Sequence, residues 1–171
     1  MGDAFISRFY MRYNDKSKEK NAKYVSLLKK LWDNRKIVFI EGENSRLGYG
    51  NDLFDNAKSI ERILCPKLNA FEKYDEIIDY ITKNVDKSKL LILALGATAT
   101  ILSYDLSNMG YQALDLGHID IEYEWFLMKA TKKEPVSNKY VSECNSDGEV
   151  SNDSLLAEYK DQIIKRIWYE Q

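Results

Sequence analysis

The chain has 171 residues, of which 25 are basic and 27 acidic, giving a formal net charge of −2. This near balance excludes a chain-wide attraction to nucleic acid or to an anionic membrane surface. Hydrophobic residues make up 44% of the sequence, so a chain of this length can bury one substantial core, and we expect residues 1–171 to form a single domain.

Targeting signals and cysteine motifs are absent from the sequence. The first residues hold no apolar run of the signal-peptide kind, and the longest apolar stretch, LLILALGATATIL, is too short and too interrupted to span a bilayer. The two cysteines, Cys65 and Cys144, show no zinc-ligand spacing. We therefore expect a cytoplasmic protein with no transmembrane segment and no nucleic-acid partner.

The first half of the chain predicts two long helices around a buried strand. Apolar residues recur at helical spacing over residues 20–33, which predicts an amphipathic helix with a buried face formed by Tyr24, Leu27, Leu28 and Leu31. The run KIVFIEGE predicts a buried strand over 36–41. A polar loop over 42–56 and a short helix over 57–64 are expected next. YDEIIDYITKNV then predicts a helix over 74–85.

The second half repeats the alternation of strands and helices. Strands are expected over 90–95 and 112–116, with a helix over 97–110 between them and another over 121–130. Residues 133–153 favour loops with one short strand at 139–143. The final stretch, SLLAEYKDQIIKRIWYE, predicts a long amphipathic helix.

This alternation predicts the α/β class: a Rossmann-like, mostly parallel sheet of at least three strands, flanked by helices. Because the chain opens abruptly on FISRFYMRY, we expect the fold to be incomplete at its N-terminus. In open parallel sheets, ligands bind beyond the carboxyl ends of the strands. The unusual polar residues of this sequence lie at the carboxyl ends of three predicted strands, in EGE (41–43), GAT (96–98) and DLGH (115–118), where such a ligand would bind.

Two of these strand ends carry features of an anion site. In LALGATAT, Gly96 allows close approach of a ligand, and Thr98 opens a helix whose first N–H groups favour a phosphate, although plain helix capping explains the same residues. In the loop EGENSRLGYGNDLFDNA, Arg46 can bind phosphate or carboxylate, and Asn51 and Asp52 can bind sugar hydroxyls or a cation. A surface loop of turn residues is the alternative.

The third strand end, DLGHIDIEYEW, concentrates acids beside the only histidine. On an extended segment, His118, Asp120 and Glu122 would point the same way, and the two carboxylates could share Mg²⁺ or Mn²⁺, or one could act as a general base. On a helix, Asp120 would instead share a face with Glu124. Acids that merely favour a helix start are the alternative. Near the N-terminus, Arg8 suits either a phosphate ligand or a plain exposed residue.

Three long stretches resemble a known family. EGENSRLGYGNDLFDNAKSIERILCP, LALGATATILSYDL and GYQALDLGHIDIEYEWFL are similar, in this order, to the GT-D-type bacterial glycosyltransferases, first catalogued as a domain of unknown function. The resemblance implies a Rossmann-like domain that transfers a hexose, commonly glucose, from a nucleotide diphosphate sugar such as UDP-glucose to a growing glycan or glycoprotein, with a divalent cation (Mn²⁺ or Mg²⁺) as cofactor.

The resemblance also implies roles for individual residues. Glu43, Arg46, Asn51, Asp52, Gly96 and Thr98 would line the donor site. His118, Asp120 and Glu122 would be catalytic, and Asp120 and Glu122 would face the metal as its ligands. Arg46 and the cation would then offset charge on the departing nucleoside diphosphate, while Asp120 or Glu122 takes the acceptor's proton.

Two other functions compete with this interpretation. The family carries a GDGE-like acidic element in an N-terminal portion, and MGDAF at the start here is not a copy of it. A truncated, inactive chain that still binds nucleotide sugar is therefore the alternative. A methyltransferase that uses S-adenosylmethionine fits poorly, because it would place a glycine-rich loop after the first strand and an acid at the end of the second.

Overall fold

The computed structural model describes residues 7–11, 17–144 and 157–169; the MGDAF start lies outside the described residues. Its centre is one sheet of five parallel strands in the order β4-β3-β1-β2-β5. The strands are β1 (Lys36–Gly42), β2 (Ser59–Cys65), β3 (Leu90–Ala94), β4 (Gln112–Asp115) and β5 (Ile163–Arg166). The α/β class with a parallel sheet flanked by helices is thereby confirmed.

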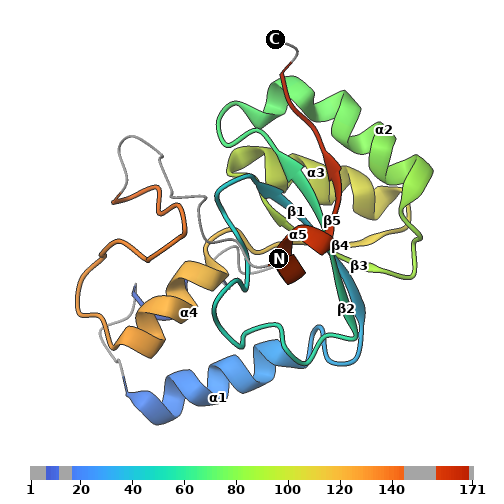
Figure 1. The fold of residues 1–171 in the computed structure, drawn as a ribbon. Helices are drawn as coiled ribbons and strands as arrows, with labels where there is room; N and C mark the ends of the chain where they lie inside the picture. Colours follow the sequence, from blue (N-terminus) through green and yellow to red (C-terminus); the bar gives the residue numbers. More distant parts are fainter. Residues whose placement is uncertain (1–6, 12–16, 145–156, 170–171) are drawn as a thin grey trace.

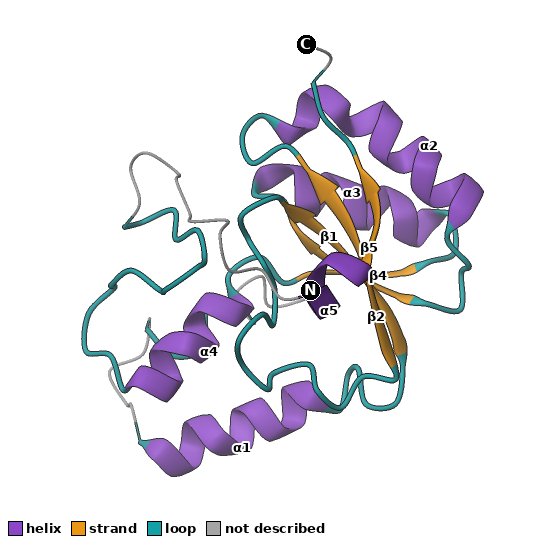
Figure 2. Cartoon of the chain, viewed as in Figure 1, coloured by secondary structure: helices purple, strands orange, loops and turns teal. Residues whose placement is uncertain are grey.

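Helices cover both faces of the sheet, so the molecule has three layers (Figure 1, Figure 2). One face carries α2 and α3, and the other carries α1 and α4. The helices are α1 (Lys18–Lys29), η1 (Ala70–Lys73), α2 (Tyr74–Asn84), α3 (Ala97–Asn108), α4 (Ile119–Met128) and α5 (Ala157–Asp161). None of the helices in the described part of the chain has the length and apolar character that crossing a bilayer requires.

Strand β1 shows how one sheet builds two cores. Ile37 and Phe39 point into the core shared with α1 and α4, whereas Val38 and Ile40 point into the core shared with α2 and α3. All four side chains are fully buried. A central parallel strand is covered on both faces, which is why KIVFI reads as a continuous apolar run rather than an alternating one.

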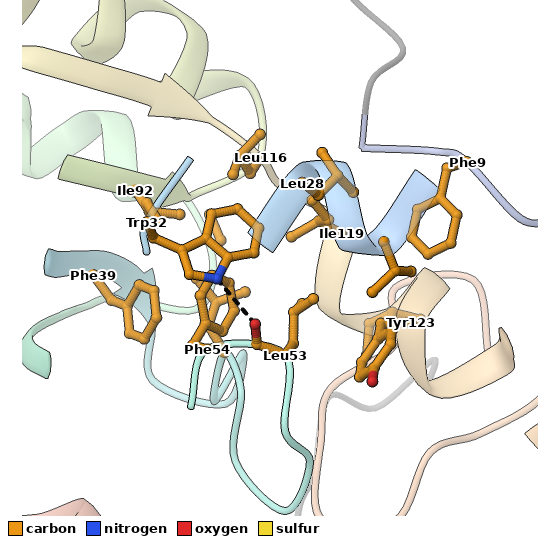
Figure 3. Close-up of a cluster of buried hydrophobic side chains, with 14 of the residues drawn as sticks. Phe9, Leu28, Trp32, Phe39, Leu53, Phe54, Ile92, Leu116, Ile119 and Tyr123 are labelled. Atoms are coloured by element: carbon orange, nitrogen blue, oxygen red, sulfur yellow. Dashed lines mark hydrogen bonds between the residues drawn. The ribbon is translucent and has the colours of Figure 1, made fainter. Parts of the chain in front are cut away.

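Trp32 anchors the α1 side of the sheet (Figure 3). Its side chain is fully buried, its ring lies 4.7 Å from that of Phe54, and its Nε1 donates a hydrogen bond of 3.0 Å to the Leu53 carbonyl. This contact pins the loop that follows β1 against the end of α1. The buried face of α1 is Val25, Leu28 and the following Trp32. Of the four residues predicted for it, Leu28 is buried and Tyr24 packs against the core, whereas Leu27 and Leu31 are 52% and 37% exposed.

Three predicted elements were wrong. Residues 57–64 hold β2, not a helix: the spacing of Ile60, Ile63 and Leu64 imitates a helical stripe, but pairing with β1 decides the conformation. The final segment is the five-residue α5 followed by β5, which pairs with β2, and residues 139–143 form turns. The other predicted helices and strands are confirmed to within a few residues.

Candidate functional site

A cleft of about 680 Å³ lies at the carboxyl edge of the sheet. Residues at the ends of β1, β2, β3 and β4 line it. This confirms that the three predicted strand ends converge, and β2, which was not predicted, adds a fourth. The lining includes Gly42, Asn44 and Ser45 after β1, Lys67 and Asn69 after β2, Gly96 and Thr98 after β3, and Asp115 and His118 after β4.

The turn into α3 forms one wall of this cleft. Gly96 has φ +54° and ψ −141°, which a residue with a side chain rarely adopts, and Gly96 and Thr98 both line the cleft. The N-terminus of α3 therefore faces the cleft with the positive end of its dipole. Thr100 donates a 2.7 Å hydrogen bond to the Asp115 carboxylate, which ties this turn to the end of β4.

The acidic segment after β4 is helical, so the expected extended arrangement of its acids was wrong and the helical alternative is confirmed. Asp120 and Glu124 share one face of α4, and both accept a 2.7 Å hydrogen bond from the Lys139 ammonium. Asn51 donates to both carboxylates as well, at 2.8 and 2.6 Å. Asp120 also accepts from the Gly48 N–H. The Asp120 carboxylate thus accepts three hydrogen bonds although it borders the cleft.

Glu122 lies on a different side of α4. Its Oε2 accepts hydrogen bonds from the backbone N–H groups of Tyr10 (2.8 Å) and Met11 (2.6 Å). The side chain is fully buried and is not part of the cleft lining. Burial raises the pKa of this carboxyl, against the lowering effect of the two backbone hydrogen bonds. The structure therefore does not bring Glu122 together with Asp120.

His118 lies on the cleft wall in contact with Arg8 and Glu143. The Arg8 guanidinium donates to the His118 Nε2 at 2.9 Å and forms an ion pair of 2.6 Å with Glu143. Burial, and then the positive charge of Arg8, lower the pKa of His118. The ring is therefore neutral at pH 7, with Nε2 as the acceptor. Ser142 lies 3.4 Å from the same nitrogen.

The loop after β1 contributes to the cleft through other residues than those predicted. Glu43, Arg46, Asn51 and Asp52 do not line it; their neighbours Asn44 and Ser45 do. Arg46 is 1% exposed and donates to the Asn138 carbonyl at 2.8 Å. Asp52 pairs with Lys29 and accepts from the Tyr123 hydroxyl; these two hydrogen bonds lower its pKa.

Glu41 and Arg62 stabilise the same loop from beneath. Their side chains form a buried ion pair of 2.5 Å, and Glu41 also accepts from the Leu47 N–H. Burial raises the pKa of Glu41, although Arg62 opposes that change. The Arg62 guanidinium lies 4.3 Å from the Tyr159 ring centroid, so this pair connects β1 to α5.

The carboxylates predicted to share a cation do not fit one. Asp120 is neutralised by Lys139, and Glu122 points out of the cleft. Within residues 7–11, 17–144 and 157–169, no three His, Cys, Asp or Glu side chains gather in a metal-binding group. Asp115 is the other carboxylate on the cleft wall, and its oxygens accept from Thr100 and the Gly117 N–H.

Sequence reasoning missed several cleft residues for two reasons. Lys67 and Asn69 follow β2, and a strand was not predicted there, so they were not placed at the carboxyl edge. The Pro66 that ends β2 was the available signal, because a proline often follows a strand or helix. Tyr140 and Ser142 come from the turns after α4, where no motif marks them.

Fold and cleft together define a class: an α/β domain with a cleft across the carboxyl ends of a parallel sheet, where such folds bind nucleotide-type ligands. The sequence profile described as "Glycosyltransferase GT-D fold" matches residues 1–144. The chain belongs to this glycosyltransferase GT-D fold family.

Curated relatives agree with this assignment. The chain is 44% identical over 169 residues to "Probable glycosyl transferase Gly" of Streptococcus gordonii, and 45% identical over 168 residues to "Glycosyltransferase GlyD" of Streptococcus pneumoniae serotype 4. These matches cover 99% and 97% of this chain. They cover 24% and 20% of the two relatives, so the chain spans about a quarter of their length or less.

Solved structures share the fold. One is described as the domain of unknown function 1792 with a distinct glycosyltransferase fold; it is 45% identical with a TM-score of 0.89, over 96% of this chain and 58% of that one. Another, a new glycosyltransferase from Streptococcus sanguinis, is 42% identical with a TM-score of 0.88, over 97% of this chain and 60% of that one.

Proposed function

We propose that this chain binds a nucleotide diphosphate sugar, of which UDP-glucose is the first candidate, and takes part in transferring its hexose to a growing glycan or glycoprotein. We place that reaction in the cytoplasm. Family membership supports glycosyl transfer as the reaction class. The single observation that carries the donor is the 680 Å³ cleft, which opens on the N-terminus of α3 beside Arg8 and Lys67.

These groups suit a diphosphate. The positive end of the α3 dipole and the two cationic side chains favour negative charge. Charge on the nucleoside diphosphate grows as its bond to the anomeric carbon breaks. N–H groups and cations that already surround the departing diphosphate therefore stabilise the transition state more than they stabilise the intact nucleotide sugar, and this difference lowers the barrier. Arg46, predicted for this role, is buried elsewhere, and Arg8 takes its place in the proposal.

His118 is the residue that we propose as proton acceptor for the sugar hydroxyl that attacks. It borders the cleft, and its lowered pKa keeps the ring neutral at pH 7, as a base requires. Its Nε2 accepts from Arg8 in this structure, so we propose that it becomes available when Arg8 turns to the phosphates. Asp120 is less suited, because Lys139 and two further donors already occupy its oxygens. Glu122 is outside the cleft and therefore cannot reach the acceptor.

Calorimetric titration with UDP and with UDP-glucose, each with Mn²⁺, Mg²⁺ or EDTA, tests the donor. We expect saturable binding that Lys67→Gln weakens, because the ammonium lines the cleft. The matched control is Lys18→Gln, on the exposed first turn of α1. Absence of binding to every nucleotide sugar at millimolar concentration would refute the proposal.

A second candidate function is donor binding without transfer by this chain. One observation favours it: of the three predicted catalytic residues, Asp120 is paired with Lys139 and Glu122 is outside the cleft, which leaves His118. The two functions separate in one assay, release of UDP from UDP-glucose with a glycan acceptor present. Binding without release at any acceptor concentration favours the second candidate.

A further inference from the structure

The segment 7–11 places Arg8 on the cleft wall. Phe9 and Tyr10, the two residues after Arg8, are each 4% exposed and belong to the core on the α1 and α4 side of the sheet. Phe9 stacks on Tyr24 with ring centroids 5.2 Å apart, and Figure 3 shows Phe9 at the edge of this cluster. The position of Arg8 is therefore set by its buried neighbours rather than by the cleft itself.

Glu122 holds the same segment by its backbone. One carboxylate oxygen accepts from two consecutive N–H groups, those of Tyr10 and Met11, while the other oxygen has no hydrogen-bond partner among the described residues. Burying a carboxylate this completely costs free energy that an apolar residue would avoid. The two hydrogen bonds offset part of that cost and fix the direction in which the segment runs.

Arg8 itself is paired, but with groups that a ligand can replace. It contacts Glu143 at 2.6 Å and His118 at 2.9 Å, and all three lie at the open side of the molecule, with side chains 28%, 20% and 33% exposed. A guanidinium binds a phosphate in the same two-pronged geometry as a carboxylate. A diphosphate in the cleft can therefore compete with Glu143 for Arg8.

We propose that Arg8 binds the phosphates of a nucleoside diphosphate in this cleft, that Glu122 is the positioning residue which holds Arg8 there, and that Glu143 is the carboxylate which the phosphates displace. The ligand class in this inference rests on the proposed function. Substitution of these three residues should change the affinity for the diphosphate in different directions. Loss of Arg8 or of Glu122 weakens binding, whereas loss of the competing Glu143 carboxylate strengthens it.

Titration of the chain with UDP and with inorganic pyrophosphate, at constant ionic strength, tests the direction in which each substitution changes the affinity. A charged hydrogen bond of this kind changes affinity by about tenfold or more, which is the loss we expect for Arg8→Gln and for Glu122→Ala. Glu122→Gln keeps an acceptor for both N–H groups and should restore binding to within about threefold. Glu143→Gln should bind UDP more tightly than the wild type. Arg35→Gln, remote from the cleft, is the control.

A double variant separates positioning from a merely structural role. If Glu122 acts through Arg8, Glu122→Ala lowers affinity no further in an Arg8→Gln background, since coupled residues are not additive. Two outcomes would overturn this inference and leave the proposed function standing, provided that the wild type binds UDP. One is additive losses of affinity in the double variant, and the other is an Arg8→Gln affinity within twofold of the wild type. If the wild type binds neither UDP nor pyrophosphate, both fall. Circular dichroism of each variant excludes unfolding as the cause.

Discussion

Lys139 is the residue whose removal we expect to be most damaging away from the sheet. Its ammonium is 1% exposed and forms ion pairs of 2.7 Å with Asp120, which is equally buried, and with Glu124. Removing one partner of a buried ion pair costs about 3–5 kcal/mol, because the other charge is left without compensation. Asp120 would keep its hydrogen bonds from Gly48 and Asn51, so Lys139→Met should fall at the lower end, about 3 kcal/mol.

Urea denaturation and thermal unfolding measure this change. For a domain of this size, 3 kcal/mol corresponds to a fall of about 6–12 °C in Tm. Adding Asp120→Asn to Lys139→Met removes the unpaired charge but keeps an oxygen for Gly48, and should recover about half of the loss. Lys83→Met, which breaks an exposed pair with Asp79, is the control and should cost about 0.5 kcal/mol or less. The reasoning fails if Lys139→Met costs less than about 1 kcal/mol or if the double variant is the less stable of the two.

Three further outcomes are expected. Gly96→Ala should cost about 1–3 kcal/mol and weaken UDP binding, measured by denaturation and calorimetry, because the left-handed backbone strains any side chain although no atom lies within 4 Å of the added carbon. Burial is the largest single influence on Glu143 and opposes its ionisation, but the hydrogen bonds from Arg8 and Ser142 and the positive charge around the carboxylate together outweigh burial and lower its pKa from 4.5 to about 2. The Glu143 carboxylate therefore stabilises the fold fully above about pH 4.5, and this contribution is lost as the pH falls toward 2. In Glu143→Gln the midpoint of urea unfolding should therefore change less with pH over that range. Burial raises the pKa of the Cys65 thiol, so iodoacetamide should label Cys144 first and Cys65 only on unfolding.

The sheet could be predicted wherever the sequence carries a local signal. β1 and β3 are runs of buried apolar residues on both faces, and such runs are typical of central parallel strands. β2 and β5 carry no such signal. β2 contains Glu61 and Arg62, and Arg62 is buried only because Glu41 of the neighbouring strand pairs with it. A contact between residues 21 positions apart is invisible to periodicity.

The site could be predicted at the level of strand ends and not of side chains. Gly96, Thr98, His118 and Asp120 were placed at the cleft because strand carboxyl ends converge in parallel sheets. The direction of each side chain depends on the local conformation. Because the segment after β4 is a helix and not an extended strand, residues two apart point to different sides, and Glu122 turns away from Asp120.

The same acidic motif therefore serves two structural purposes at one edge of the cleft. Asp120 and Glu124 cross-link the loop after β1 to the turn that carries Lys139, and Glu122 fixes the segment that carries Arg8. A lysine ammonium between two carboxylates occupies the position that a bound cation would take between the same acids. Lys139 thus offsets one of the two carboxylate charges in this part of the cleft wall, and Arg8, Lys67 and the start of α3 are the groups that attract an anion.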